Sequence, residues 1–152
     1  MKTLVLGIGN LLRSDDGVGL HVIGKLSGEI LAPGVDVKEA ASGLDILDAI
    51  KGYDRLILVD AIKSGGEPGS ICKLSEEEFQ TAPTVHSFST HLNMDFFSVL
   101  ELGGKLFPGE IPGDITVVAV EADDVITISD KCTPRVERAI PKAVEMIKGL
   151  LS

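Results

Sequence analysis

Residues 4–23, LVLGIGNLLRSDDGVGLHVI, join an apolar run to a glycine-rich turn and then to a helical pattern. A short apolar run that ends at a glycine is typical of a buried strand in a parallel sheet. After the turn an apolar residue recurs at every fourth position, which predicts one buried face of a helix over residues 16–31. These apolar residues are Val18, Val22, Leu26 and Ile30. A strand that leads directly into a helix is the repeating unit of α/β folds.

Further strand patterns alternate with helical ones along the chain. Residues 55–60, RLILVD, and 114–120, DITVVAV, have the continuous apolar character of buried strands. Weaker strand patterns lie at 35–38 and at 69–74, GSICKL. We expect the second of these, residues 69–74, at an edge of the sheet. The alternation predicts a mostly parallel, twisted sheet between two layers of helices. We therefore expect an α/β fold of three layers, α/β/α, that forms a single domain over residues 1–152.

Three further helices are predicted from apolar spacing and from signals at their ends. A short helix follows Gly43, and another spans residues 89–104, STHLNMDFFSVLELGG, which its two terminal glycines are expected to end. The last helix begins after Thr133, whose hydroxyl is suited to cap it, with Pro134 in its first turn. Pro141 lies inside this helix and is expected to kink or restart it.

The composition excludes several classes of partner. The chain has 152 residues and a formal net charge of −9, which both nucleic acid and anionic membranes would repel. Aromatic residues make up 4% of the chain and tryptophan is absent, which leaves few side chains on which bases could stack. The first residues lead directly into a short strand rather than into a signal peptide or membrane span. We therefore expect a soluble, cytoplasmic, monomeric protein that binds neither nucleic acid nor membrane.

Polar side chains follow the predicted strands at the edge where α/β folds bind their ligands. Asp15 and Asp16 follow the first strand, Asp60 ends the strand at residues 55–60, and His91 stands at the entry of a later helix. We assign Asp15 mainly to capping the helix after it, and the other three residues to a functional site. Carboxylates that face each other at strand ends are costly to ionise unless a cation or proton lies between them.

The three site residues, Asp16, Asp60 and His91, form a mixed oxygen and nitrogen ligand set. Such a set suits nickel, zinc, iron or manganese better than calcium or magnesium. From the residues alone, roles as helix caps or surface groups stay open beside the metal site. Cys72 and Cys132 do not form a CxxC pair and have no obvious histidine partner in the sequence, which argues against a cysteine nucleophile.

The glycine-rich turn matches only part of a dinucleotide-binding fingerprint. Gly7 and Gly9 fit the first half of GxGxxG, but Leu12 stands where the third glycine belongs. The adjacent Asp15 and Asp16 would also repel a phosphate group. The turn therefore favours a cation over an anion.

Four segments resemble the hydrogenase maturation proteases, and the resemblance runs over essentially the whole chain. They are LVLGIGNLLRSDDGVG at 4–19, LILVDAI at 56–62, STHLN at 89–93 and CTPRVERAI at 132–140. The resemblance implies an α/β domain with a twisted central sheet between helices. It also implies three metal-contacting positions: an acid in the glycine-rich loop, an aspartate ending a later strand and a histidine beginning a helix. These positions correspond to Asp16, Asp60 and His91.

The same resemblance implies a peptidase, aspartic-type by family label. Its substrate would be the large-subunit precursor of a nickel–iron hydrogenase, from which it removes the C-terminal extension after nickel has been inserted. The nickel would be supplied by the substrate, and Asp16, Asp60 and His91 would be both its contacts and the catalytic groups. Two other hypotheses stay open. One is a cofactor- or nucleotide-binding regulatory α/β module without peptidase activity, and the other is a hydrolase of small molecules with a resident metal.

Overall fold

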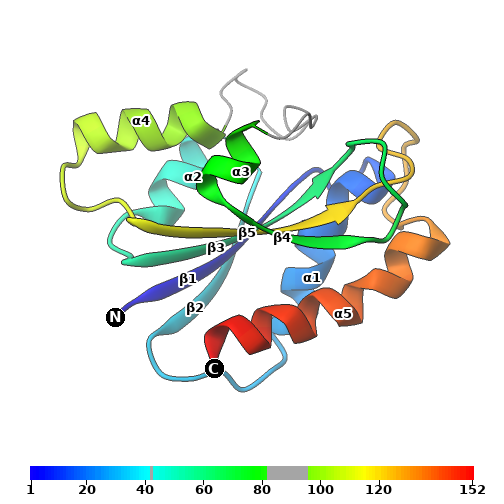
Figure 1. Cartoon of the computed structure of the whole chain (residues 1–152), viewed down its shortest axis with the longest axis horizontal. Coiled ribbons are helices and arrows are strands. Elements are labelled where there is room, and N and C mark those ends of the chain that lie inside the picture. The colour runs from blue at the N-terminus through cyan, green and yellow to red at the C-terminus, as the bar shows by residue number, and fades with distance from the viewer. Residues whose placement is uncertain (42, 82–95) are drawn as a thin grey trace.

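The computed structural model describes residues 1–41, 43–81 and 96–152. The described strands form one sheet in the order β2-β1-β3-β5-β4 (Figure 1). They are β1 (Thr3–Ile8), β2 (Val35–Ala40), β3 (Arg55–Ile62), β4 (Ile71–Ser75) and β5 (Asp114–Glu121). β1 pairs in parallel with β2 and β3, and β3 with β5, whereas β4 runs antiparallel to β5 at the edge. The mostly parallel sheet and the edge position of β4 confirm the prediction.

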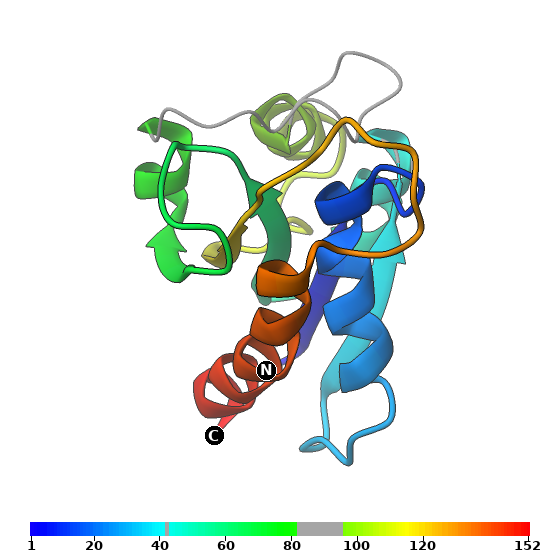
Figure 2. The same ribbon diagram turned by 90° about the vertical axis from the view of Figure 1, so that its right-hand side faces the viewer.

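Helices cover both faces of this sheet. They are the 3₁₀-helix η1 (Ser14–Gly17), α1 (Val18–Leu26), α2 (Gly43–Ile50), α3 (Glu76–Thr81), α4 (Phe96–Leu106) and α5 (Pro134–Leu151). α1 and α5 lie side by side on one face (Figure 2), and the helices α2, α3 and α4 pack on the other. Successive strand residues point to opposite faces, so Val5 of β1 joins one core whereas Leu4 and Leu6 join the other. The three-layer α/β/α architecture is confirmed.

Glycine lets α1 lie directly against the strands. A Cβ atom at Gly19 would lie 2.5 Å from the carbonyl oxygen of Val59 and 2.6 Å from that of Ile8. A Cβ atom at Gly7 would lie 2.6 Å from the carbonyl oxygen of Gly19. The helix and strand backbones are thus in contact, which no residue with a side chain would permit. This close approach holds the beginning of α1 at the carboxyl end of the sheet.

Two predicted helix boundaries are wrong. α1 ends at Leu26 rather than at residue 31, and Ile30, the last residue of the predicted apolar face, is 99% exposed. α4 continues past its pair of glycines, while residues 89–95 of that predicted helix lie outside the described residues. Gly103 serves packing instead of ending the helix, because a Cβ atom there would lie 2.7 Å from the Leu47 side chain.

α5 is a single helix that passes through Pro141, so the restart expected at this proline does not occur. Thr133 and Pro134 occupy the predicted N-cap and first-turn positions. The Thr133 hydroxyl, however, donates a hydrogen bond to Asp15 Oδ2 at 2.8 Å and does not cap the helix. Among the described helices, α5 included, none combines the length and the apolar character that a membrane span requires.

Candidate active site

Asp16 and Asp60 approach each other where β1 and β3 end. Asp60 lies near the end of β3, and Asp16 lies in η1, which follows β1. The turn between β1 and η1 folds back at Gly9, whose φ is +148° and whose Cβ atom would lie 2.1 Å from the carbonyl oxygen of Asp16. The Asn10 N–H then donates a hydrogen bond to Asp16 Oδ2 at 3.2 Å. Glycine at this position is therefore what allows the turn to bring Asp16 to the end of the sheet.

Asp60 is a buried carboxylate with one oxygen that no described residue bonds. The residue is 1% exposed, and its Oδ1 accepts a hydrogen bond from the Ala61 N–H at 2.8 Å. Its Oδ2 has no hydrogen-bond partner among the described residues. Burial raises the pKa of Asp60 well above its ordinary value, and the negative charge of Asp16 raises it further against the smaller effect of the Ala61 N–H. Asp60 Oδ2 is therefore available to a proton or a cation.

The carboxyl group of Asp16 is perturbed in the same direction. Burial raises its pKa, although the Asn10 N–H and the charge of Arg13 lower it. Two buried carboxylates whose charges interact are not both ionised unless a positive charge compensates them. Either one of the two carboxyl groups, Asp16 or Asp60, thus holds a proton or a cation compensates their charge. Oxygen donors of this kind fit a divalent metal ion, so the described part of the predicted ligand set is compatible with a metal.

The third predicted ligand, His91, lies outside the described residues. Within residues 1–41, 43–81 and 96–152, no group of three or more histidine, cysteine, aspartate or glutamate side chains is arranged to hold a metal ion. The structure thus brings together two of the three predicted site residues, Asp16 and Asp60. A contribution from His91 stays a prediction.

The beginning of η1 does not present its N–H groups to an anion. These groups donate to carbonyl oxygens within the protein. The N–H of Ser14 donates to Ser129 at 2.9 Å, that of Asp15 to Asp124 at 2.9 Å and that of Asp16 to Arg13 at 3.0 Å. Phosphate binding at the beginning of a helix requires free N–H groups. The observed bonding therefore supports the prediction that this turn is not a dinucleotide site.

Asp15 holds the acid-bearing loop in place. It is fully buried, and its carboxylate accepts hydrogen bonds from three backbone N–H groups and one hydroxyl. The donors are the N–H groups of Asp123 (2.9 Å), Asp124 (3.0 Å) and Thr133 (2.7 Å), and the Thr133 hydroxyl (2.8 Å). These donors belong to the loop after β5 and to the beginning of α5. The predicted capping role is therefore wrong, because Asp15 links two loops and does not cap its own helix.

Glu121 links loops in the same manner at the end of β5. It is buried, and its Oε2 accepts a hydrogen bond from the Ser64 N–H at 2.9 Å while its Oε1 accepts one from the Ser64 hydroxyl. The loop after β3 is thereby tied to β5. A signal for this role was present in the sequence, because Glu121 ends an apolar run just as Asp60 does.

The cysteines are poorly placed for catalysis. Burial raises the pKa of the Cys132 thiol and, together with the negative charges of Asp15 and Glu137 and a hydrogen bond to Asp15, brings it to about 12. Cys72 is exposed on the edge strand β4, and β5 separates it from β3. A thiol that stays protonated at neutral pH is a weak nucleophile. This agrees with the prediction that neither cysteine is the nucleophile.

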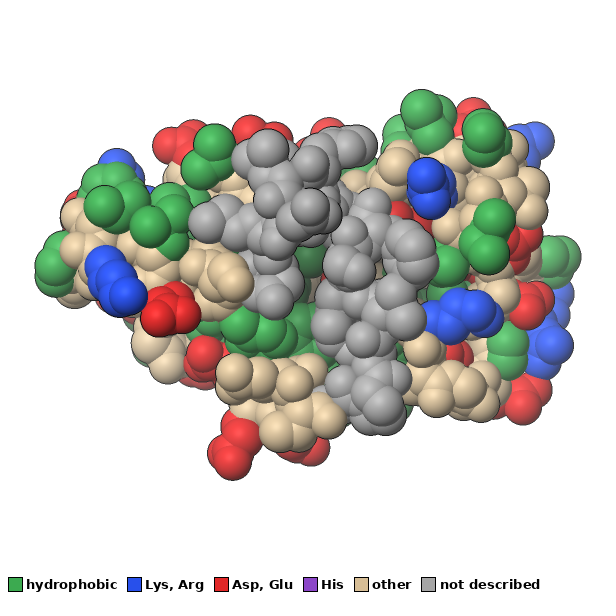
Figure 3. Space-filling view, turned by 90° about the horizontal axis from the view of Figure 1, so that it is seen from above, with side chains coloured by type: hydrophobic (Ala, Val, Ile, Leu, Met, Phe, Trp, Pro, Cys, Tyr) green, Lys and Arg blue, Asp and Glu red, His purple; other side chains and the backbone are tan. Residues whose placement is uncertain are grey.

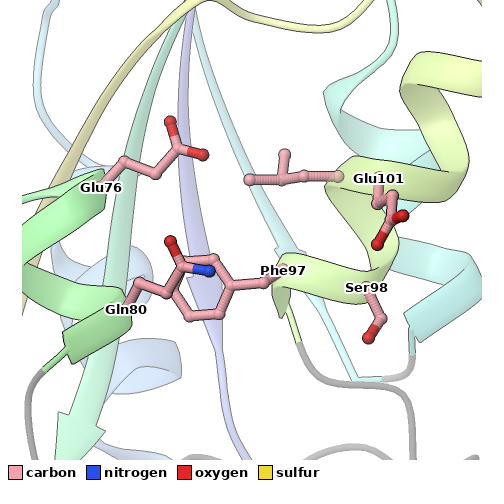
Figure 4. Close-up of a pocket in the computed structure, with 6 residues that line it drawn as sticks. Glu76, Gln80, Phe97, Ser98 and Glu101 are labelled. Carbon is pink, nitrogen blue, oxygen red and sulfur yellow. The ribbon is translucent and has the colours of Figure 1, made fainter.

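A pocket between α3 and α4 is separate from the acid pair (Figure 4). Its lining consists of Glu76, Gln80, Phe97, Ser98, Leu100 and Glu101. In Figure 4 the side chains of Glu76 and Gln80 from α3 face those of Phe97 and Ser98 from α4. Neither Asp16 nor Asp60 lines this pocket. We therefore centre the candidate site on the acid pair.

Comparison with known proteins identifies the family of this chain. A family model described as "Hydrogenase maturation protease" matches residues 20–150. The chain belongs to the hydrogenase maturation protease family. The hydrogenase 2 maturation protease of Escherichia coli (strain K12) is 30% identical over 155 aligned positions, which cover 99% of this chain and 91% of that protein. The hydrogenase expression/formation protein HupD of Thiocapsa roseopersicina is 27% identical over 147 positions, which cover 95% of this chain and 65% of that protein.

Solved structures of this family share the fold. The hydrogenase maturating endopeptidase HybD from E. coli superimposes with a TM-score of 0.84 at 30% identity, covering 99% of this chain and 92% of that one. The NiFe hydrogenase maturation protease HybD from Thermococcus kodakarensis gives a TM-score of 0.79 at 25% identity, with both chains covered completely, 100% each. The predicted family, fold class and enzyme class, a peptidase, are thus confirmed.

Proposed function

We propose that this chain is the endopeptidase that removes the C-terminal extension from the large-subunit precursor of a nickel–iron hydrogenase after nickel insertion. Relatives named as hydrogenase maturation proteases support this substrate class. The observation that carries the proposal is Asp60 Oδ2, a buried carboxylate oxygen without a partner among the described residues and close to the charge of Asp16. A cation carried by the substrate would satisfy this oxygen and compensate the charge of the pair.

In this proposal Asp16, Asp60 and His91 contact the nickel that the precursor already holds. A shell of two carboxylates and one imidazole is incomplete, and the precursor's own ligands complete it. Nickel-free precursor would leave Asp60 Oδ2 unpaired, and an unpaired buried acceptor costs about 1–3 kcal/mol. The site would therefore favour loaded precursor by the free energy of that missing contact.

The cleaved peptide bond would lie beside the same pair of carboxylates. A general base must be within hydrogen-bond reach of the attacking water and is most effective when its pKa is near the working pH. Burial raises the pKa of both Asp16 and Asp60 from the low values of ordinary aspartates. We therefore assign the role of base to whichever member of this pair keeps an oxygen that does not contact the nickel.

Cleavage of precursor tests the proposal directly. Nickel-loaded and nickel-free precursor are incubated with the protein, and loss of the extension is followed by mass spectrometry. We expect cleavage of loaded precursor only, and no cleavage by Asp16→Asn, Asp60→Asn or His91→Ala. Asp48→Asn, at an exposed position of α2, is the matched control and should cleave at the wild-type rate. Wild-type activity in Asp60→Asn would refute the site, and no cleavage of a cognate loaded precursor would refute the function.

The origin of the metal is tested on the free protein. Metal analysis after purification without chelator should find much less than one equivalent of tightly bound metal. A stoichiometric metal that does not exchange would instead support a hydrolase with a resident ion. Calorimetry with NAD and ATP completes the comparison, since tight binding of either would support a nucleotide-binding module.

A further inference from the structure

Four large apolar side chains are exposed beside the acid pair. Leu11 (42% exposed) and Leu12 (62%) follow β1, whereas Ile126 (77%) and Ile128 (85%) follow β5. We call these four residues the apolar rim. Seen from above, hydrophobic side chains with basic and acidic ones among them gather over the loops after β1 and β5, at the right of Figure 3. Exposed apolar groups gathered next to a site are typical of an interaction surface.

The two halves of the rim are joined by backbone hydrogen bonds. The Ser129 N–H donates to the carbonyl oxygen of Leu12 at 3.0 Å, and the Ser14 N–H donates to that of Ser129 at 2.9 Å. These bonds form a parallel bridge between Arg13 and Ser129, whose register places Leu12 beside Ile128. Residues from two distant parts of the chain therefore form one continuous surface.

Further bonds hold the loop after β5 in this exposed arrangement. Asp124 Oδ1 accepts hydrogen bonds from the N–H groups of Ile126 and Thr127, both at 2.9 Å. The N–H group of Asp124 itself donates to the buried carboxylate of Asp15 at 3.0 Å. A loop fixed in this way does not collapse to bury its isoleucines, so their exposure is a stable property of the surface. A surface that is ordered before binding loses little entropy when a partner docks.

The rim adjoins the proposed site directly. The Asp16 N–H donates to the carbonyl oxygen of Arg13 at 3.0 Å, and Leu12 immediately precedes Arg13. The exposed side chains of Arg13 and Lys131 lie at this edge together with the exposed acidic side chains of Asp123 and Asp130, so charges of both signs surround the rim. The surface thus suits an apolar segment. Anionic membranes and a second copy of this acidic chain are disfavoured, because the net charge repels both.

We propose that the apolar rim binds the polypeptide segment of the precursor that flanks the cleaved bond. This inference rests on the proposed function, because it takes the occupant to be the substrate of the same site. A segment that packs on Leu12, Ile126 and Ile128 would be held close to the acid pair, because Leu12 lies only four positions before Asp16 in the chain. The rim would then contribute affinity for the polypeptide, whereas Asp16 and Asp60 would recognise the metal.

Truncation of the rim should weaken substrate binding without slowing the chemical step. We expect Leu12→Ser, Ile126→Ser and Ile128→Ser each to raise KM for nickel-loaded precursor about tenfold. This is the expected effect of losing one aliphatic side chain that is buried only in the complex. The value of kcat should stay within about twofold, because binding that is equal in ground state and transition state affects KM alone. Ile30→Ser, at an isoleucine that is 99% exposed in the loop before β2, is the matched control and should leave both constants unchanged.

Direct binding of the same loaded precursor separates failure of the rim from failure of the function. Wild-type KM in all three rim variants of a cleaving enzyme would overturn the rim proposal alone. If the wild type binds loaded precursor without cleaving it and the rim variants no longer bind it, the rim proposal is supported and the proposed function is refuted. A wild type that neither binds nor cleaves would refute both. A dimer in solution that Ile128→Ser dissociates, with KM unchanged, would assign the rim to self-association and overturn the proposal.

Discussion

The same chemical change at two buried aspartates should alter stability in opposite directions. Asp60→Asn is expected to stabilise the protein, whereas Asp15→Asn is expected to destabilise it. Both residues are almost completely inaccessible, at 1% and 0% exposure, so solvent does not distinguish them. They differ in their hydrogen bonds, because Asp60 Oδ2 lacks a partner among the described residues while both oxygens of Asp15 are bonded.

At Asp60 the substitution removes an unfavourable group. Asparagine keeps the acceptor for the Ala61 N–H, which is bonded at 2.8 Å, and replaces the oxygen that has no partner among the described residues by an amide that carries no negative charge. Leaving a buried polar atom unpaired costs about 1–3 kcal/mol, which sets the expected gain in the free energy of unfolding.

The gain at Asp60 should depend on pH with a defined sign. The folded state binds the Asp60 proton more tightly than the unfolded state, so ionisation of this group destabilises the fold. The loss of stability begins as the pH rises above the ordinary pKa of 3.8 and is complete above the raised folded-state pKa. Asp60→Asn should therefore exceed the wild type by more at about pH 9 than at about pH 5.

At Asp15 the substitution removes favourable bonds. Oδ2 accepts from Asp123, Asp124 and the Thr133 hydroxyl, and Oδ1 accepts from the Thr133 N–H. Asparagine has one carbonyl oxygen, so its amide group must face at least one of these donors. We expect a loss of about 2–3 kcal/mol, since hydrogen bonds to an ionised carboxylate are among the stronger ones. Such a loss is a large part of the roughly 5–15 kcal/mol that stabilises a typical domain.

Urea unfolding followed by circular dichroism measures both effects. The buffers contain EDTA, so that no adventitious metal binds the acid pair. Asp48→Asn, at an exposed position of α2, serves as the control and should lie within about 0.5 kcal/mol of the wild type. Destabilisation by Asp60→Asn at both pH values, or a neutral Asp15→Asn, would refute the distinction between an unpaired and a fully bonded carboxylate.

Three further outcomes are expected. Gly9→Ala should destabilise the fold by about 2 kcal/mol or more in urea unfolding, because φ is +148° and a Cβ atom would lie 2.1 Å from a carbonyl oxygen; a neutral effect would contradict the tight turn. Alkaline ultraviolet titration of Tyr53, the one tyrosine in a chain without tryptophan, should give a pKa of about 12, because burial and the hydrogen bond to Asp36 both raise it. Asp36→Asn should bring that pKa toward 10.0, and an unchanged titration would exclude the contact. Exposed Cys72 should react with a thiol reagent well before Cys132, whose pKa is raised to about 12; equal rates would contradict its burial.

Much of the fold and part of the site were predictable from local sequence patterns. Continuous apolar runs mark β1, β3 and β5 because strands of a covered parallel sheet are buried on both faces. The carboxyl ends of parallel strands lie at one edge, so acids placed after two such runs were expected to meet there. The negative charge of Asp16, which raises the pKa of Asp60, agrees with that expectation.

The sequence by itself thus determined the order of strands and helices, the family and the position of two acids, because these depend on periodicity and on residues close together in the chain. Only the tertiary structure decided what each acid does. The donors to Asp15 lie 108 to 118 residues away, whereas Asp60 Oδ2 has no donor among the described residues. Whether a buried polar group is satisfied depends on which distant segments fold against it, and no local pattern records that. For this reason two buried aspartates have different roles: Asp15 holds the loops together, whereas Asp60 keeps an oxygen that no described residue bonds.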